Sequence, residues 1–74
     1  MTELQREFQA HNPRLCYIDH RYIGNRQVGI SFIALVGSSV MGGVRIYNIV
    51  DGNIDWKNPG KTYDSWSNIQ QRSR

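Results

Sequence analysis

The chain of 74 residues lacks several features that large classes of proteins require. Cys16 is its only cysteine, so no disulfide can form within one chain, which fits a reducing compartment. Its first residues, MTELQREFQAHNPR, contain acids and glutamines where a signal peptide needs an apolar stretch. The chain also has no Asn-x-Ser/Thr acceptor for glycosylation. We therefore expect a cytoplasmic protein.

Concentrated charge is lacking as well. The chain has nine Lys and Arg, six Asp and Glu, and a net charge of +3. The basic surplus is spread evenly over residues 1–27, 28–50 and 51–74, with no run of like charge. Proteins that bind nucleic acids usually gather Lys and Arg on one face, so this composition favours nucleic-acid binding only slightly.

Charge is absent altogether from Gln27 to Val44, a stretch of 18 residues. This length is close to the minimum for a membrane-spanning helix, but its many Gly and Ser residues make it only weakly apolar. A phosphate-binding loop does not fit the stretch: Gly37 and Gly42 have the required spacing, but Gly43 stands where the lysine belongs. Two buried strands around a connection explain the stretch best.

Local patterns predict a mainly β protein with one short helix. Residues 2–11 have a Thr N-cap and an apolar pair four residues apart, which is typical of a helix. Residues 15–23, 28–36, 44–50 and 53–56 are rich in β-formers. Asp51-Gly52 predicts a tight hairpin turn, and residues 37–43 a flexible connection. The second half of 28–36 is apolar on both faces, which predicts a central strand covered on both sides.

These elements predict a single domain over residues 1–74 with a β-rich core at 15–56. Its architecture is expected to be a small antiparallel sheet or a partly open SH3-like barrel of about four strands. Residues 62–70 suit either a helical turn or a last strand, and residues 70–74 are expected to fray. Such a small sheet has an exposed edge strand, so homodimerisation through that edge is a further expectation.

The chain offers no pattern for catalysis, for a metal or for a cofactor. Cys16, Asp19 and His20 are close in sequence, but a strand places Cys16 and His20 on one face about 13 Å apart. A zinc site needs about four ligands, and a thiolate nucleophile needs a base within hydrogen-bond reach. We therefore expect no catalytic, cofactor-binding or metal-binding residues, and a protein that is not an enzyme.

Aromatic and basic residues alternate along the chain and predict a binding surface. Tyr, Trp and Arg anchor protein interfaces, whereas a small core also needs aromatic rings, so Tyr47, Trp56 and Trp66 are expected to be structural. The residues expected to contact a partner are Arg21, Tyr22, Arg26, Arg45 and Lys57. Arg21 and Arg45 are expected to project from the more polar faces of their strands.

The favoured function is a binding module that regulates or inhibits a protein partner through a face rich in Tyr and Arg. A small accessory protein of a phage or mobile element, acting on host machinery, would have this size and character. The alternative is binding to RNA or single-stranded DNA, in which bases stack on rings and cations follow the phosphates. The third hypothesis is a small membrane protein with one span.

Overall fold

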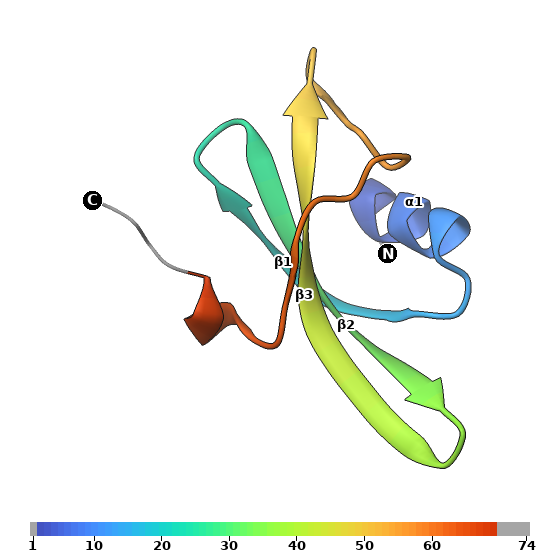
Figure 1. Cartoon of the computed structure of the whole chain (residues 1–74). Coiled ribbons are helices and arrows are strands. Elements are labelled where there is room, and N and C mark those ends of the chain that lie inside the picture. The colour runs from blue at the N-terminus through green and yellow to red at the C-terminus, as the bar shows by residue number, and fades with distance from the viewer. Residues whose placement is uncertain (1, 70–74) are drawn as a thin grey trace.

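Figure 1 shows the computed structural model of the chain, in which residues 2–69 are described. Its strands form one antiparallel, curled half-barrel sheet in the order β1-β2-β3-β4, and β5 also pairs with β3. The mainly β fold with a short N-terminal helix is therefore confirmed. The elements are α1 (Glu3–His11), β1 (Cys16–Ile23), β2 (Gln27–Val36), β3 (Ser39–Val50), β4 (Asn53–Ile54), β5 (Thr62–Tyr63) and a 3-10 turn (Trp66–Asn68).

The turn between β2 and β3 is much tighter than the sequence suggested. Val36 already pairs with Ser39, so only two residues connect the strands. The first of them, Gly37, has φ of 63°, which suits the type II′ turn that hairpins favour. The flexible connection predicted for 37–43 is therefore wrong, because five of these residues belong to β3.

The turn after β3 confirms the hairpin predicted at Asp51-Gly52. Both residues have positive φ, 54° and 80°, as a type I′ turn requires. The strand that follows is shorter than predicted, since β4 contains only Asn53–Ile54. The Trp56 backbone N–H then donates to the Ile54 carbonyl oxygen, and the chain turns away from the sheet.

A β-bulge changes which side chains of β1 share a face. The register against β2 shifts between Tyr17 and Asp19, which makes Ile18 the extra residue. Strict alternation predicts Cys16 and His20 on the same face, and this prediction is wrong, because the bulge separates them. His20 shares a face with Tyr17 instead.

The main core lies between α1 and one face of the sheet. Phe8 of α1 is fully buried, and its ring lies 6.2–6.4 Å from four other aromatic rings. Val28 and Ile30 add buried aliphatic side chains from alternate positions of β2. The aromatic partners of Phe8 are Tyr17, Phe32, Tyr47 and Trp56.

Two polar side chains of α1 and its C-cap fix the helix to the sheet. The Gln9 amide donates to the Leu15 carbonyl oxygen at 2.8 Å and accepts from the Tyr17 backbone N–H at 2.7 Å. The Asn12 side-chain nitrogen donates to the Tyr47 hydroxyl at 3.3 Å. Because these bonds satisfy backbone and buried groups, they determine where a helix of only nine residues docks.

The C-terminal segment covers part of the opposite face of the sheet, as Figure 1 shows in orange and red. Tyr63 pairs with Val44, and Trp66 then lies against Gly29, where an added Cβ would be 2.9 Å from the ring atom Cζ3. The range 62–70, for which helix and strand were both open, thus begins with a strand and continues into a 3-10 turn. Residues 70–74, predicted to fray, lie outside the described residues.

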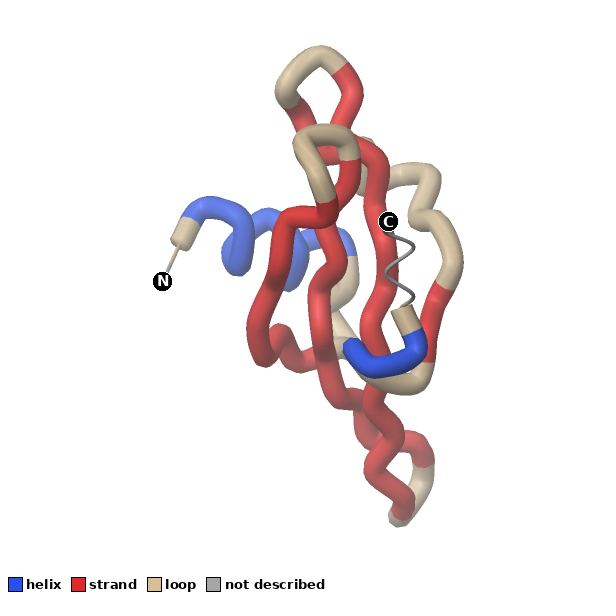
Figure 2. The backbone as a smooth tube through the Cα atoms, turned by 90° about the vertical axis from the view of Figure 1, so that its left-hand side faces the viewer, coloured by secondary structure: helices blue, strands red, loops and turns tan. Residues whose placement is uncertain are grey.

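The end of the β2–β3 hairpin projects beyond the rest of the sheet, as Figures 1 and 2 both show. The pairing of β1 with β2 ends at Ile33, and the pairing of β5 with β3 begins at Val44. We call residues 34–41, which pair only with each other within the described part of the chain, the ribbon. The uncharged stretch is thus a β-hairpin, and no helix within residues 2–69 is long and apolar enough to cross a membrane.

Candidate functional site

The five residues predicted to contact a partner do not lie on one face of the sheet. Arg21 pairs with Gly29 and its neighbour Tyr22 pairs with Val28, so their side chains point to opposite faces. The other three lie elsewhere, Arg26 and Lys57 exposed in separate turns and Arg45 within β3. The fold therefore does not assemble these residues into a single Tyr- and Arg-rich surface.

Arg45 is held within the fold. It pairs with Ile30 and so lies on the core face of β3, which makes the prediction that it projects from a polar face wrong. Its Nη1 donates to the Asn12 side-chain oxygen at 3.1 Å, and its guanidinium lies 5.5 Å from the centre of the Phe32 ring. Arg45 therefore joins the C-cap of α1 to the core.

Arg21 has a different environment, at the border of the C-terminal segment. Its guanidinium carbon lies 4.7 Å from the centre of the Trp66 ring, in a cation–π arrangement. Trp66 thus lies close to both Arg21 and the sheet backbone at Gly29. Arg21 stays exposed, so it adds one positive charge beside the indole.

The face that carries α1 also holds a pair of titratable side chains. The Tyr17 hydroxyl and His20 Nδ1 are 2.6 Å apart, and the Tyr22 ring contacts the His20 ring edge-on. Burial raises the pKa of the Tyr17 phenol above its ordinary value of 10.0, with smaller contributions from Asp19 and Tyr22. The Tyr17 and His20 side chains are thus hydrogen-bonded to each other and pack with Tyr22 on this face of the sheet.

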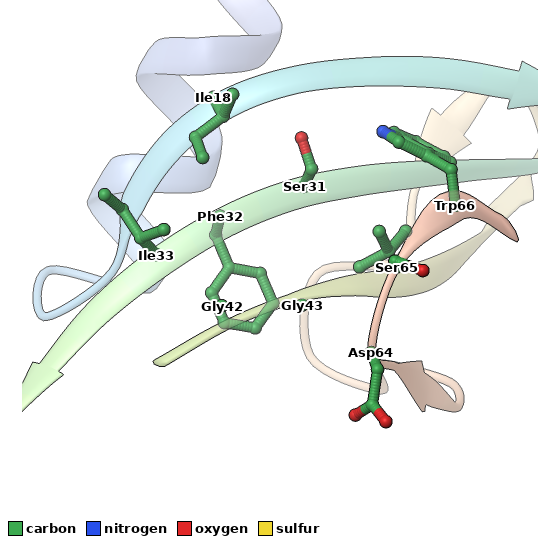
Figure 3. A pocket seen from close by; sticks show the side chains of 10 residues that line it. Ile18, Ser31, Phe32, Ile33, Gly42, Gly43, Asp64, Ser65 and Trp66 are labelled. Atoms are coloured by element: carbon green, nitrogen blue, oxygen red, sulfur yellow. The ribbon is translucent and has the colours of Figure 1, made fainter. Parts of the chain in front are cut away.

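A shallow groove of about 450 Å³ lies on the opposite face, beside Trp66 (Figure 3). One wall comes from Ile18 and Ile33, and the other from the segment 64–66. Between them, Gly42 contributes no side chain; a Cβ there would lie 3.3 Å from Ile33 Cγ2. The groove is therefore a depression that glycine leaves in a mainly apolar surface.

Exposed apolar side chains continue from this groove onto the ribbon. We call Ile18, Ile33, Leu35 and Val40 the apolar strip. Ile18 and Ile33 are 54% and 40% exposed in the groove wall, and Leu35 and Val40 are 76% and 65% exposed on the ribbon. Leu35 and Val40 are directly opposite each other across the β2–β3 ladder. The strip thus joins the apolar wall of the groove to one face of the ribbon, and Ser31, Asp64 and Ser65 supply the polar part of the groove lining.

The sequence pattern indicates an apolar segment here, but the prediction that it is buried is wrong. Ile33 to Val36 are apolar on both faces, which led to the prediction of a strand covered on both sides. The structure covers this part of β2 on neither face, because α1 and the C-terminal segment both stop short of the ribbon. The available signal for a projecting hairpin is that this apolar run is followed by Gly37-Ser38-Ser39 and, after Val40 and Met41, by Gly42-Gly43.

Within the part of the chain that the structure describes, no group of three His, Cys, Asp or Glu residues could hold a metal ion. Cys16 is exposed and lies on the face opposite His20. Comparisons of the chain with protein-family models, with curated proteins and with solved structures found no match.

Proposed function

We propose that the protein is a non-enzymatic binding module that docks a protein partner on the apolar strip and the adjoining groove. The observation that carries this proposal is the strip itself. Four large apolar side chains lie in a row on the surface, and two of them line a groove. Contiguous exposed apolar surface of this kind marks interaction sites in small soluble domains.

Burial of the exposed side chains of the strip would contribute favourably to binding. Full burial of a Leu, Ile or Val side chain contributes about 1.5–3 kcal/mol, and Leu35 exposes 76% of its surface. Covering Leu35 alone is therefore worth about 1–2 kcal/mol, which corresponds to a roughly 5- to 30-fold change in Kd. The partner segment that suits the strip is itself apolar, because a charged group placed there would lose water without gaining a counterion.

The strip has more support as a docking surface than the face rich in Tyr and Arg. Of the residues predicted for that face, Arg45 is hydrogen-bonded to Asn12 and Arg21 is stacked on Trp66, so both guanidinium groups already have partners within the fold. Arg21 borders the groove and is placed to contact the rim of the partner. The regulation or inhibition of host machinery, predicted from size and character, stays a prediction.

Nucleic-acid binding has less support for a related reason. Stacking of bases needs exposed rings, and Tyr47 and Trp56 pack against each other at 4.9 Å in the core. The faces of the Trp66 and Tyr63 rings already contact Arg21 and Lys61, respectively, in cation–π arrangements. Tyr22 is the one aromatic side chain among residues 2–69 that is more than half exposed.

The test compares two double variants that each remove two exposed apolar side chains. Leu35→Thr with Val40→Thr alters the strip, whereas Tyr22→Thr with Val50→Thr alters exposed positions away from it. Wild type and both variants would be used for affinity capture from host lysate, with and without nuclease. The captured partner would then be purified and its Kd measured by calorimetry.

We expect the strip variant to weaken binding at least tenfold, with little change for the other variant and no effect of nuclease. Loss of the partner with Tyr22→Thr and Val50→Thr, but not with the strip variant, would refute docking on the strip. Capture that nuclease abolishes would instead favour the nucleic-acid alternative.

A further inference from the structure

We infer that the protein forms a two-fold symmetric homodimer by antiparallel pairing of the outer edge of β3, residues 39–43, with the same edge of a second copy. This inference goes beyond the proposed function. It depends on the backbone N–H and carbonyl groups of the hairpin edge, whereas partner docking depends on the side chains of the strip; Val40 contributes to both.

The hydrogen bonds of β3 show which backbone groups face outward. Ile46 N–H donates to the Lys61 carbonyl oxygen, and the Ile46 carbonyl oxygen accepts from Gly60 N–H, so Ile46 faces away from β2. Because backbone direction alternates along a strand, Gly42 and Val40 also face away from β2. The ladder between β2 and β3 is continuous through this region, so no bulge interrupts the alternation.

These outward groups have no strand partner within residues 2–69. The pairing of β5 with β3 stops at Tyr63, which is opposite Val44. After Tyr63 the chain turns onto the face of the sheet, where Trp66 lies against Gly29. Val40 and Gly42 thus present two N–H donors and two carbonyl acceptors along one exposed edge.

The edge also lacks the devices that usually prevent strands from pairing. Natural edge strands carry Lys, Pro, bulges or inward-pointing charges. Residues 39–43 are Ser-Val-Met-Gly-Gly, with regular register and no charge. Such an edge is a template for another strand without charge.

A second copy is the partner whose chemistry fits best. In a two-fold interface each residue near the axis meets its own counterpart, so any charge there would be repelled by an identical charge. The whole stretch 27–44 is uncharged, and an axis through the ribbon brings no like charges together. Antiparallel pairing also satisfies the two-fold symmetry, because residues before and after the axis exchange hydrogen bonds.

Pairing centred on Met41 further complements the surface. Val40 then lies opposite the partner's Gly42, so an exposed valine covers the backbone that glycine leaves bare in the groove. The two hairpins form a continuous four-stranded ribbon, and the two apolar strips face the same way on each side of the axis. The interface is small, so we expect a Kd on the order of 1–100 µM.

The test uses proline to remove one outward N–H from either edge of the same hairpin. Leu35 is paired with Val40, so its N–H also points outward, but on the β2 edge beyond the end of β1. Val40→Pro and Leu35→Pro each remove one exposed apolar side chain and one outward donor without breaking the β2–β3 ladder. Mass would be measured by sedimentation equilibrium over a concentration series, and folding by near-UV circular dichroism.

We expect a concentration-dependent dimer for wild type and for Leu35→Pro, and at least a tenfold weaker dimer for Val40→Pro. A wild-type protein that stays monomeric at 500 µM would overturn the inference, as would a dimer that only Leu35→Pro disrupts. Purified protein suffices for this test, so a negative result leaves partner capture to be judged on its own.

A second measurement covers the case in which a proline variant does not fold. In a Cys16→Ser background, single cysteines would replace Val40, Met41 or Leu35 and be oxidised with copper phenanthroline. Residues that oppose themselves across the axis have Cα atoms close enough for a disulfide. With the axis at Met41, we expect rapid cross-linking at position 41 and little at positions 40 and 35; equal rates at all three would refute the β3-edge pairing.

Discussion

Gly29 in the middle of β2 offers the sharpest test of how the C-terminal segment is held. A Cβ at this position would lie 2.9 Å from Trp66 Cζ3 and 3.2 Å from Ile46 Cδ1. The first distance is too short for two carbons, whereas the second needs only a small movement of a side-chain end. We therefore expect Gly29→Ala to displace the Trp66 ring from the sheet.

Two opposing contributions determine how much Gly29→Ala changes the free energy of unfolding. Alanine is about 0.5–1 kcal/mol more favourable than glycine in the interior of a strand, because glycine loses more backbone freedom on folding. Forcing an extra carbon against a packed ring costs about 1–3 kcal/mol. Gly29→Ala should therefore lower the free energy of unfolding by about 0.5–2 kcal/mol in the wild-type background. With Trp66→Ala already present, the clash is gone, and the same substitution should raise it by about 0.5–1 kcal/mol.

This reversal of sign is measured by urea unfolding of the four proteins in the double-mutant cycle. Tryptophan fluorescence adds a local readout, since displacement of Trp66 should shift its emission to the red. The expected coupling between the two positions is about 1–3 kcal/mol. An effect of Gly29→Ala that is the same in both backgrounds would refute the contact between Trp66 and the sheet.

Three further outcomes follow from the fold. The folded state raises the Tyr17 pKa, so above about pH 10 the folded protein binds more protons at this residue than the unfolded chain does. The free energy of unfolding should therefore fall as the pH rises in this range. Tyr17→Phe should flatten this slope in alkaline unfolding curves. Tyr47→Phe removes a buried hydroxyl that contacts Asn12 at 3.3 Å, and should lower the free energy of unfolding by about 0.5–1.5 kcal/mol, or Tm by several degrees; no change in Tm would contradict the contact. Gly37→Ala places a Cβ on a residue with φ of 63°, at a cost of about 1–2 kcal/mol, and hydrogen exchange should show faster exchange in the ribbon with the core unaffected.

Local patterns predicted the parts of the fold that local physics determines. Thr2 does accept a hydrogen bond from the Gln5 backbone N–H at the start of α1, and Asp51-Gly52 does form the expected turn. Each depends on the conformational preference of two to four neighbouring residues. The buried position of Tyr47 was also expected, since so small a core needs its large aromatic rings.

The candidate site could not be predicted in the same way, because it depends on where covering elements end. The pattern of Ile33 to Val36 is equally consistent with burial on both faces and with exposure on both faces. Only the lengths of α1 and the C-terminal segment decide between them. The faces of β1 were mispredicted because one bulge at Ile18 reverses the alternation for part of the strand.

The position of β3 has a consequence for the order in which the chain assembles. This strand pairs with β2 along one side and with β4 and β5 along the other, so it is the element on which the sheet depends. Its connections to β2 and β4 span two residues each, whereas β5 returns only after a longer excursion. Short loops close with less loss of entropy, so the meander of β2, β3 and β4 is expected to form first, with the C-terminal segment added last. A chain interrupted between β4 and β5 would therefore keep its main core and lose one wall of the groove.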